Sequence, residues 1–227
     1  MRWLKIFKKQ PETTDMRLKR ASIIDLSTPI DMCPYVVIDS ELTGLNPKKD
    51  SSISIGALKM SGTIIKIGEP FYEIVSPSTE FTAESVVVHG IMPAETTGKP
   101  SIGNVINDFL AFCEECVVVG HFISLDLTFI NIELKKLYDR TFDNPVIDTY
   151  KIHDWIKHHS GDFSRHFRGD REKDLFSIAK NYKIQITGLH NALMDAFITA
   201  QLFQRFLWYL PNLGVKTVKE LLLIGKP

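Results

Sequence analysis

Two carboxylates near the end of a short apolar segment are the first residues that could do chemistry. Residues 35–44 read Tyr-Val-Val-Ile-Asp-Ser-Glu-Leu-Thr-Gly, with Asp39 and Glu41 two positions apart. In a strand such residues point to the same face, so both acids should project together from its end. Like charges this close repel each other unless a cation or a shared proton lies between them. The pattern indicates either a site for a hard divalent cation or a strand end whose acids face water.

Three residues further along the chain could join these acids. Asp126 follows a Gly-His turn after the apolar residues 117–120, and sites in open α/β sheets form beyond the carboxyl ends of parallel strands. Asp195 has mostly apolar neighbours, where a buried charge is costly unless it is paired or bound to a metal. His190 precedes Asp195 by five residues. Each also has an ordinary structural interpretation: a helix cap for Asp126, a surface ion pair for Asp195 and a buried imidazole for His190.

The composition is that of an ordinary globular protein. The chain has 227 residues, 44% of them hydrophobic and 24% charged, and its formal net charge is zero. The length predicts one domain with short extensions, and zero net charge leaves room only for a local basic groove. No apolar run approaches the roughly 18 residues that span a bilayer. The basic N-terminus lacks the apolar core of a secretory signal, so we expect a cytoplasmic protein without a transmembrane segment.

The three cysteines do not predict a disulfide framework. Cys113 and Cys116 have the spacing of metal ligands, but no second Cys or His pair matches them. Cys116 also opens an apolar run, so burial explains this thiol better than zinc or redox chemistry.

The hydrophobic pattern predicts an α/β protein with a mixed sheet. The expected strands cover residues 35–38, 52–58, 64–75, 117–120 and 145–148. The expected helices cover residues 82–90, 101–114, 125–138, 149–158, 173–183, 189–209 and 217–223. Short turns between the first three strands imply an antiparallel meander, and the later alternation of strand and helix implies parallel pairing. We therefore expect a five-stranded sheet, an antiparallel meander followed by parallel strands, with helices on both faces.

Two polar segments have open interpretations. Residues 1–9 separate an apolar stripe from a basic one at helical spacing, which fits either a docking helix or a frayed terminus. Residues 158–171 are rich in His and Arg with two interleaved Phe, which fits either a phosphate-gripping loop or a solvated excursion. We expect residues 1–33 to be a basic N-terminal extension and residues 211–227 to be a short C-terminal helix and tail.

Three segments, in order and spacing, resemble the motifs of the DEDDh 3′–5′ exonuclease superfamily. They are Asp-Ser-Glu-Leu-Thr-Gly at 39–44, Gly-His-Phe-Ile-Ser-Leu-Asp-Leu at 120–127 and His-Asn-Ala-Leu-Met-Asp-Ala at 190–196. Within the superfamily the chain is most similar to the branch of the bacterial DNA polymerase III epsilon subunit and its stand-alone relatives. The resemblance covers residues 34–210, which would form the exonuclease domain.

The resemblance implies an RNase H-like fold and a phosphodiesterase that uses two divalent ions, Mg²⁺ or Mn²⁺. Asp39, Glu41 and Asp195 would hold the first ion, and Asp39 with Asp126 acting through water would hold the second. His190 would be the general base that takes the proton from the attacking water. The products would be nucleoside 5′-monophosphates released from a 3′-hydroxyl end.

Other positions would meet the terminal nucleotide. The expected substrate-binding residues are Leu42, Thr43, His89, His121 and Phe122. Leu42 stands where relatives have Thr, and Phe122 stands where Asn is common. Leu125 replaces a usual Phe. These departures concern sugar and base preference and leave the expected metal ligands intact.

We expect the substrate to be a single-stranded or frayed DNA 3′ end, in repair or proofreading. The alternative is an exoribonuclease that trims RNA or short oligoribonucleotides, because the 2′-hydroxyl is read by pocket shape and not by the acids. All five motif residues are present, which argues against a catalytically idle binding module. A DNA polymerase or repair protein is a candidate partner, and the basic N-terminal arm is its only evident contact segment.

Overall fold

The computed structural model describes residues 24–81, 83–160, 174–186 and 191–227. Structural statements below concern these residues. Residues 1–9 and most of the polar segment 158–171, with both interpretations of each, lie outside them.

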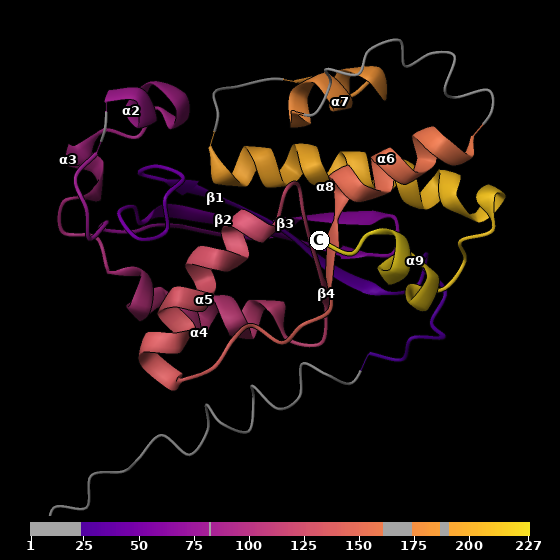
Figure 1. Ribbon diagram of the computed structural model, residues 1–227, viewed down its shortest axis with the longest axis horizontal. Helices are drawn as coiled ribbons and strands as arrows, with labels where there is room; N and C mark the ends of the chain where they lie inside the picture. The colour runs from indigo at the N-terminus through magenta and orange to yellow at the C-terminus, as the bar shows by residue number, and fades with distance from the viewer. Residues whose placement is uncertain (1–23, 82, 161–173, 187–190) are drawn as a thin grey trace, which may run out of the picture.

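Five strands form one mixed sheet in the order β3-β2-β1-β4-β5 (Figure 1). They are β1 (Pro34–Leu42), β2 (Ser52–Ser61), β3 (Ile64–Ile74), β4 (Val117–Gly120) and β5 (Val146–Asp148). Strand β2 is antiparallel to both β1 and β3, whereas β4 is parallel to β1 and β5 is parallel to β4. The predicted meander followed by parallel strands is confirmed.

Helices cover both faces of the sheet (Figure 1). One face carries α4 (Ile102–Cys113) and α5 (Ser124–Tyr138). The other carries α6 (Thr149–His159), α7 (Leu175–Asn181), α8 (Ala192–Tyr209) and α9 (Val218–Ile224). The remaining helices are α2 (Ala83–His89), α3 (Pro93–Thr96) and the 3-10 turn η2 (Leu210–Leu213). Helix α3, which has only four residues, was not predicted.

Side chains alternate along β1, and this decides which helical layer each residue meets. Tyr35 and Val37 belong to the apolar cluster on the α8 face. Val36 and Ile38 belong to the cluster under α4 and α5. Continuing the alternation, Asp39 and Glu41 lie on the α8 face and Ser40 lies on the opposite one.

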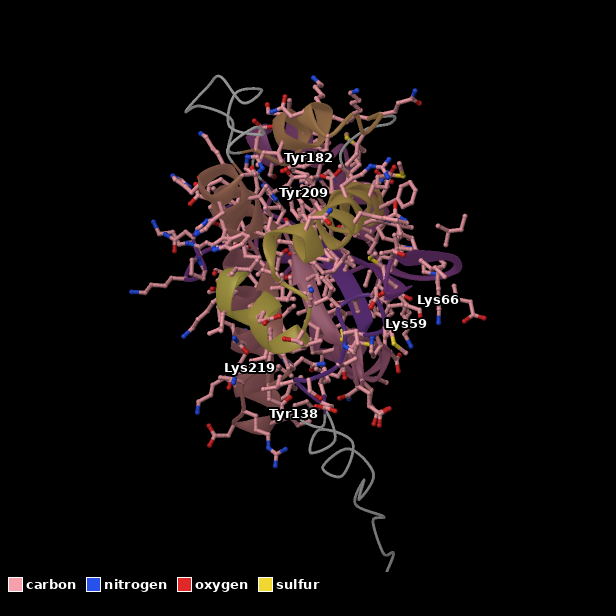
Figure 2. All side chains as sticks on the ribbon, turned by 90° about the vertical axis from the view of Figure 1, so that its right-hand side faces the viewer. Lys59, Lys66, Tyr138, Tyr182, Tyr209 and Lys219 are labelled. Atoms are coloured by element: carbon pink, nitrogen blue, oxygen red, sulfur yellow. The ribbon has the colours of Figure 1, made fainter. Side chains whose placement is uncertain are left out.

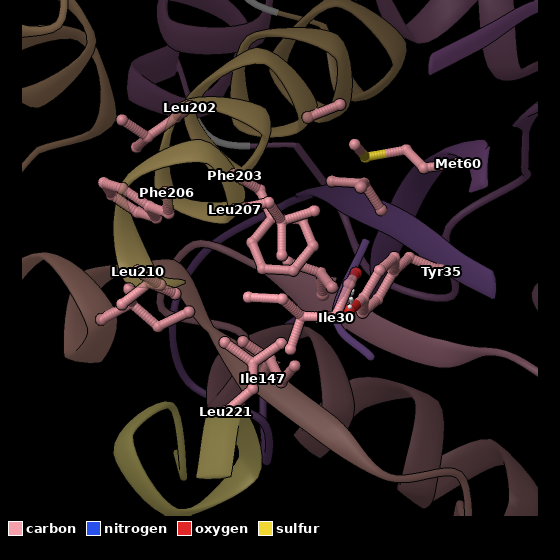
Figure 3. Close-up of a cluster of buried hydrophobic side chains, with 14 of the residues drawn as sticks. Ile30, Tyr35, Met60, Ile147, Leu202, Phe203, Phe206, Leu207, Leu210 and Leu221 are labelled. Carbon is pink, nitrogen blue, oxygen red and sulfur yellow. Dashed lines mark hydrogen bonds between the residues drawn. The ribbon is translucent and has the colours of Figure 1, made fainter. Parts of the chain in front are cut away.

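The larger core lies between the sheet and α8 (Figure 3). The ring of Phe203 meets the ring of Tyr35 edge-on, with centroids 4.9 Å apart. The Tyr35 hydroxyl donates a hydrogen bond to the Ile30 carbonyl at 2.8 Å. Leu210 and Leu221 extend this cluster toward the C-terminus. These contacts hold α8 rigidly across the strands.

The described part of the expected N-terminal extension is packed structure. Ile30 and Cys33 are buried in the core, and Pro29 forms an isolated bridge with Thr217. Thr217 begins α9 and forms a capping box with Glu220. The segment before β1 therefore lies against the C-terminal helix.

The β2–β3 hairpin is irregular. The register shifts between Ala57 and Lys59, which increases the local twist. Beyond the shift, Lys59 pairs with Lys66, and both carry their charges to the same side of the molecule (Figure 2). The Lys59 ammonium lies 4.8 Å from the centre of the Phe112 ring, which stabilises it beside the second lysine.

All three cysteines are buried and free, and the burial expected for Cys116 is confirmed. Among the described residues no helix is both long and apolar enough to cross a membrane.

Candidate active site

Three carboxylates meet where β1 ends. Asp39 and Glu41 come from β1, and Asp195 comes from the first turn of α8. One carboxylate oxygen from each lies within 4.8 Å of the others. The alternation of β1 explains the grouping, because both strand acids face the helix that carries the third.

A glycine allows α8 to come this close. Asp39 pairs across the sheet with Gly56 of β2. A Cβ atom at Gly56 would lie 2.3 Å from the backbone nitrogen of Leu193 and 2.5 Å from the carbonyl oxygen of Ala192. Real side chains do not tolerate such distances, so any other residue would push the start of α8 away from the strand. The position of Asp195 therefore depends on Gly56.

The first turn of α8 is fixed by its own cap. Asn191 accepts a hydrogen bond through its side chain from the Met194 amide at 2.9 Å. Such caps satisfy amides that have no partner inside the helix. Asn191 thereby anchors the turn that presents Asp195.

Asp126 reaches the same region from the opposite helical layer. It lies in the first turn of α5 and is only 7% exposed. Ser40 donates a hydrogen bond from its hydroxyl to Asp126 Oδ1 at 2.5 Å. Asp126 stands outside the tight group of three, but its negative charge raises the pKa of both Asp39 and Glu41. Acids from both faces of the sheet thus converge on the end of β1.

The electrostatics of this cluster are unfavourable without a positive charge. Burial, followed by the charges of the neighbouring acids, raises the pKa of Asp39 well above its ordinary value. Burial and then Asp195 and Asp126 raise the pKa of Glu41 to about 7. The pKa of Asp126 also rises to about 7, because burial outweighs the bond from Ser40. An all-carboxylate donor set of this kind fits a hard divalent cation.

Tyr72 is a neighbour of the cluster that the sequence did not reveal. It stands on β3 opposite Gly56, which in turn stands opposite Asp39. Burial and then the charge of Glu41 raise the pKa of Tyr72. Only the pairing across three strands brings the phenol here, so local spacing carried no signal for it.

His121 is oriented by Thr149, the first residue of α6. The Thr149 hydroxyl donates a hydrogen bond to the Gly120 carbonyl at 3.1 Å and lies 2.9 Å from His121 Nδ1. Because a hydroxyl has one proton, Thr149 accepts from His121, so Nδ1 carries the hydrogen. The expected substrate-binding imidazole is therefore held in one tautomer at the end of β4.

Phe122 has an unusual backbone. Its φ is 53°, in the left-handed region that non-glycine residues enter at a cost of about 1–2 kcal/mol. Its amide donates to Asp148 Oδ1 at 3.2 Å, and its carbonyl accepts from the Leu125 amide at 3.1 Å. The side chain is 42% exposed. Asp148 was not among the predicted site residues.

The other expected substrate-binding residues differ in exposure. Leu42 follows a register shift after Glu41 and is partly exposed. Thr43 is fully buried, and its hydroxyl accepts a hydrogen bond from the Ser51 amide at 3.0 Å. Its amide donates to the Ser51 carbonyl at 2.9 Å, so Thr43 fixes the loop behind Leu42.

His89 is buried at the end of α2. Its Nδ1 accepts a hydrogen bond from the Ile91 amide at 3.0 Å, and burial lowers its pKa, so the ring is neutral with the hydrogen on Nε2. Within the part of the chain that the structure describes, Nε2 has no hydrogen-bond partner. His190, the expected general base, lies outside the described residues.

Comparisons with known proteins agree with this geometry. A family model described as exonuclease (RNase_T) matches residues 36–203. The DNA polymerase III subunit epsilon of Aquifex aeolicus is 33% identical over 183 residues, which are 79% of this chain and 85% of that protein. The PolC-type DNA polymerase III of Thermotoga maritima is 30% identical over 187 residues, which are 82% of this chain but 13% of that protein.

Solved structures share the fold at lower identity. Exonuclease X in complex with 5′ overhanging duplex DNA has a TM-score of 0.63 and 21% identity, and the match covers 84% of this chain and 98% of that one. E. coli exonuclease I in complex with a dT13 oligonucleotide has a TM-score of 0.69 and 16% identity, with 81% and 43% covered. The fold is RNase H-like, as the sequence motifs implied.

Proposed function

Because this chain belongs to the exonuclease family and is a 3′–5′ exonuclease, we propose that it removes nucleoside 5′-monophosphates from DNA 3′ ends by a two-metal mechanism with a histidine base. The observation that carries this proposal is the meeting of Asp39, Glu41 and Asp195 within 4.8 Å. Their mutual repulsion is relieved by protons or by divalent cations, and an all-carboxylate donor set fits the cations.

The residues of the cluster fit two ions, Mg²⁺ or Mn²⁺. Asp39, Glu41 and Asp195 would hold the first, and Asp39 with Asp126 would hold the second. Two such ions supply positive charge to the attacking and leaving oxygens of an in-line displacement. Ser40 keeps the Asp126 carboxylate in place through its hydrogen bond. The backbone and apolar side chain of Leu42 would line the pocket of the terminal nucleotide.

His190 is the proposed general base. It precedes Asp195 in the third motif, and a neutral imidazole accepts a proton near physiological pH. Replacing His190 with Ala should lower the hydrolysis rate by about a hundredfold or more, which is typical of a general base. The assignment is refuted by an unchanged rate at saturating Mn²⁺.

DNA is the proposed substrate because the relatives and structural neighbours point to it. The relatives that match over most of this chain include a DNA polymerase III subunit, and exonuclease X was solved with DNA. We propose a proofreading or repair role at frayed ends, with a DNA polymerase as a candidate partner. A primer with a mismatched 3′ end should then be shortened faster than a matched one.

The decisive experiment is digestion of matched 5′-labelled oligonucleotides of DNA and RNA with Mn²⁺. We expect a ladder of 3′-shortened DNA products, release of nucleoside 5′-monophosphates, and no reaction when EDTA removes the metal. Faster digestion of the RNA strand would show that RNA, and not DNA, is the preferred substrate. Internal cuts, or activity in EDTA, would contradict the mechanism.

A further inference from the structure

Three aromatic rings gather at the carboxyl ends of β4 and β5. The ring centroids of Phe122 and Tyr150 are 4.6 Å apart with an angle of 34° between the rings. His121 meets Phe122 edge-on at 4.8 Å and Tyr150 edge-on at 6.2 Å. Phe122 is thus supported by two neighbours while 42% of it remains exposed. A large apolar ring in this position offers a fixed surface to solvent.

One carboxylate anchors both members of the closest pair. Asp148 Oδ1 accepts hydrogen bonds from the Phe122 amide at 3.2 Å and from the Tyr150 amide at 2.8 Å. The left-handed backbone of Phe122 persists because both its amide and its carbonyl are bonded. Strained conformations of this kind concentrate at functional sites. The anchor fixes an exposed ring where an unstrained chain would not present it.

The rings lie beside the carboxylate cluster. Strands β1 and β4 run parallel and pair up to Val37 and Val119. Asp39 and His121 each stand two residues beyond that pair. The acids and the rings therefore share the carboxyl edge of the sheet, with the rings on the side of β5.

We propose that Phe122, supported by Tyr150, is a stacking platform for an unpaired base near the 3′ end of the substrate strand. This inference rests on the proposed function and specifies how the strand is held. Every nucleobase has a π-face, so stacking on an aromatic ring is tolerant of sequence. The platform therefore selects unpaired ends of any sequence and rejects a strand that lacks the base.

Fluorescence of 2-aminopurine tests the platform directly. Single-stranded DNA carries the probe at each of its last four positions, and binding is measured with Ca²⁺ in place of Mn²⁺. We expect wild-type protein to quench one position most strongly. Phe122→Ala should abolish that quenching and raise the Kd by about 5- to 100-fold, the range expected for loss of one base–aromatic stack. Phe122→Trp should preserve both.

Two further variants separate stacking from folding. Phe122→Leu retains an apolar side chain without a ring and should behave as Phe122→Ala does. Trp208 is 69% exposed on α8, and Trp208→Ala should leave quenching and Kd unchanged. Replacing the base at the quenched position with an abasic unit should weaken wild-type binding by the same factor and Phe122→Ala binding no further.

Equal quenching and equal Kd for wild type and Phe122→Ala at every position overturn the platform. Hydrolysis of labelled DNA with Mn²⁺ is scored separately. Hydrolysis without ring-dependent quenching also overturns the platform but leaves the proposed function standing. Ring-dependent quenching without hydrolysis supports the platform and contradicts the proposed reaction.

Discussion

The two halves of α8 have opposite effects on the stability of the fold. The first turn places Asp195 among other carboxylates, where its charge helps to raise the pKa of Asp39 and Glu41. The later turns bury Phe203 and Phe206 completely in the core shown in Figure 3. At neutral pH without metal, the first turn therefore opposes folding and the later turns favour it.

This contrast shows how the fold tolerates its active site. A large apolar contact between α8 and the sheet supplies the stability, so the same helix can hold an acid where acids repel one another. Functional sites commonly carry such local conflicts, which the rest of the structure offsets. Substitutions in the two halves should consequently separate activity from stability.

The largest effect should follow a substitution in the acidic cluster that the first turn of α8 completes. Asp39→Asn should lower the rate of DNA hydrolysis by about 10³-fold or more, because Asp39 is the proposed ligand of both ions. The exposed Asp139→Asn is a matched control, since Asn tolerates its left-handed backbone. Single-turnover rates with Mn²⁺ give the comparison. Similar rates for the two variants would show that Asp39 is not a ligand of the metal ions.

A substitution in the later, apolar turns of α8 should instead lower stability and leave the rate of hydrolysis nearly unchanged. Phe203→Ala should lower the free energy of unfolding by about 3–5 kcal/mol through lost burial and a residual cavity. The folded fraction should hydrolyse DNA nearly as fast as wild type. Urea unfolding and activity measured on the same samples check both parts. A lost rate in fully folded protein would show that the two halves are not separable.

Between about pH 4 and pH 7, the pH dependence of stability reports mainly on the acidic cluster. Burial raises the pKa of Glu41 from 4.5 to about 7 and that of Asp126 from 3.8 to about 7. The folded protein therefore holds these protons more tightly than the unfolded chain does. In EDTA, the contribution of these groups to stability is greatest below about pH 4 and falls as the pH rises to about 7, by on the order of 3 kcal/mol for one such group.

Urea unfolding in EDTA across this range measures the slope, and Glu41→Gln should reduce it. Asp25, Asp174 and Glu220 have lowered pKa values and act in the opposite direction, but they lie on the surface and titrate at lower pH. A wild-type stability that rises between pH 5 and pH 8 in EDTA would contradict the account.

The smallest of these effects should come from the contact between α8 and β2. Gly56→Ala should cost about 1–3 kcal/mol of stability by overpacking and about 10- to 100-fold in rate by displacing Asp195. Gly68→Ala is the control, because a Cβ there meets nothing within 4 Å. Equal rates for the two alanine variants would show that the helix start does not need Gly56.

Local patterns predicted what depends on neighbours in sequence. Alternation along β1 correctly placed Asp39 and Glu41 on one face. The hydrophobic pattern of residues 217–223 predicted α9. The four-residue helix α3 is too short to show a periodic pattern. The burial of Ile30 was missed because its segment is polar and irregular, and only its contacts with distant residues make it core.

Contacts between distant residues explain the remaining omissions. Asp148 fixes Phe122 across 26 positions of sequence, and neither strand pattern hints at the bond. A glycine is needed at position 56 because the start of α8 packs directly against it. The sequence of β2 alone does not reveal this contact. Tyr72 reaches the acids only through strand pairing.

The acidic cluster destabilises the folded protein until cations bind it. The most direct test compares the unfolding free energies of wild type and Asp39→Asn at pH 8, in EDTA and in saturating Mn²⁺. We predict that their order reverses: the variant is more stable in EDTA, where one repelling charge is gone, and less stable in Mn²⁺, where wild type gains more from binding. The same order in both solutions would contradict the account.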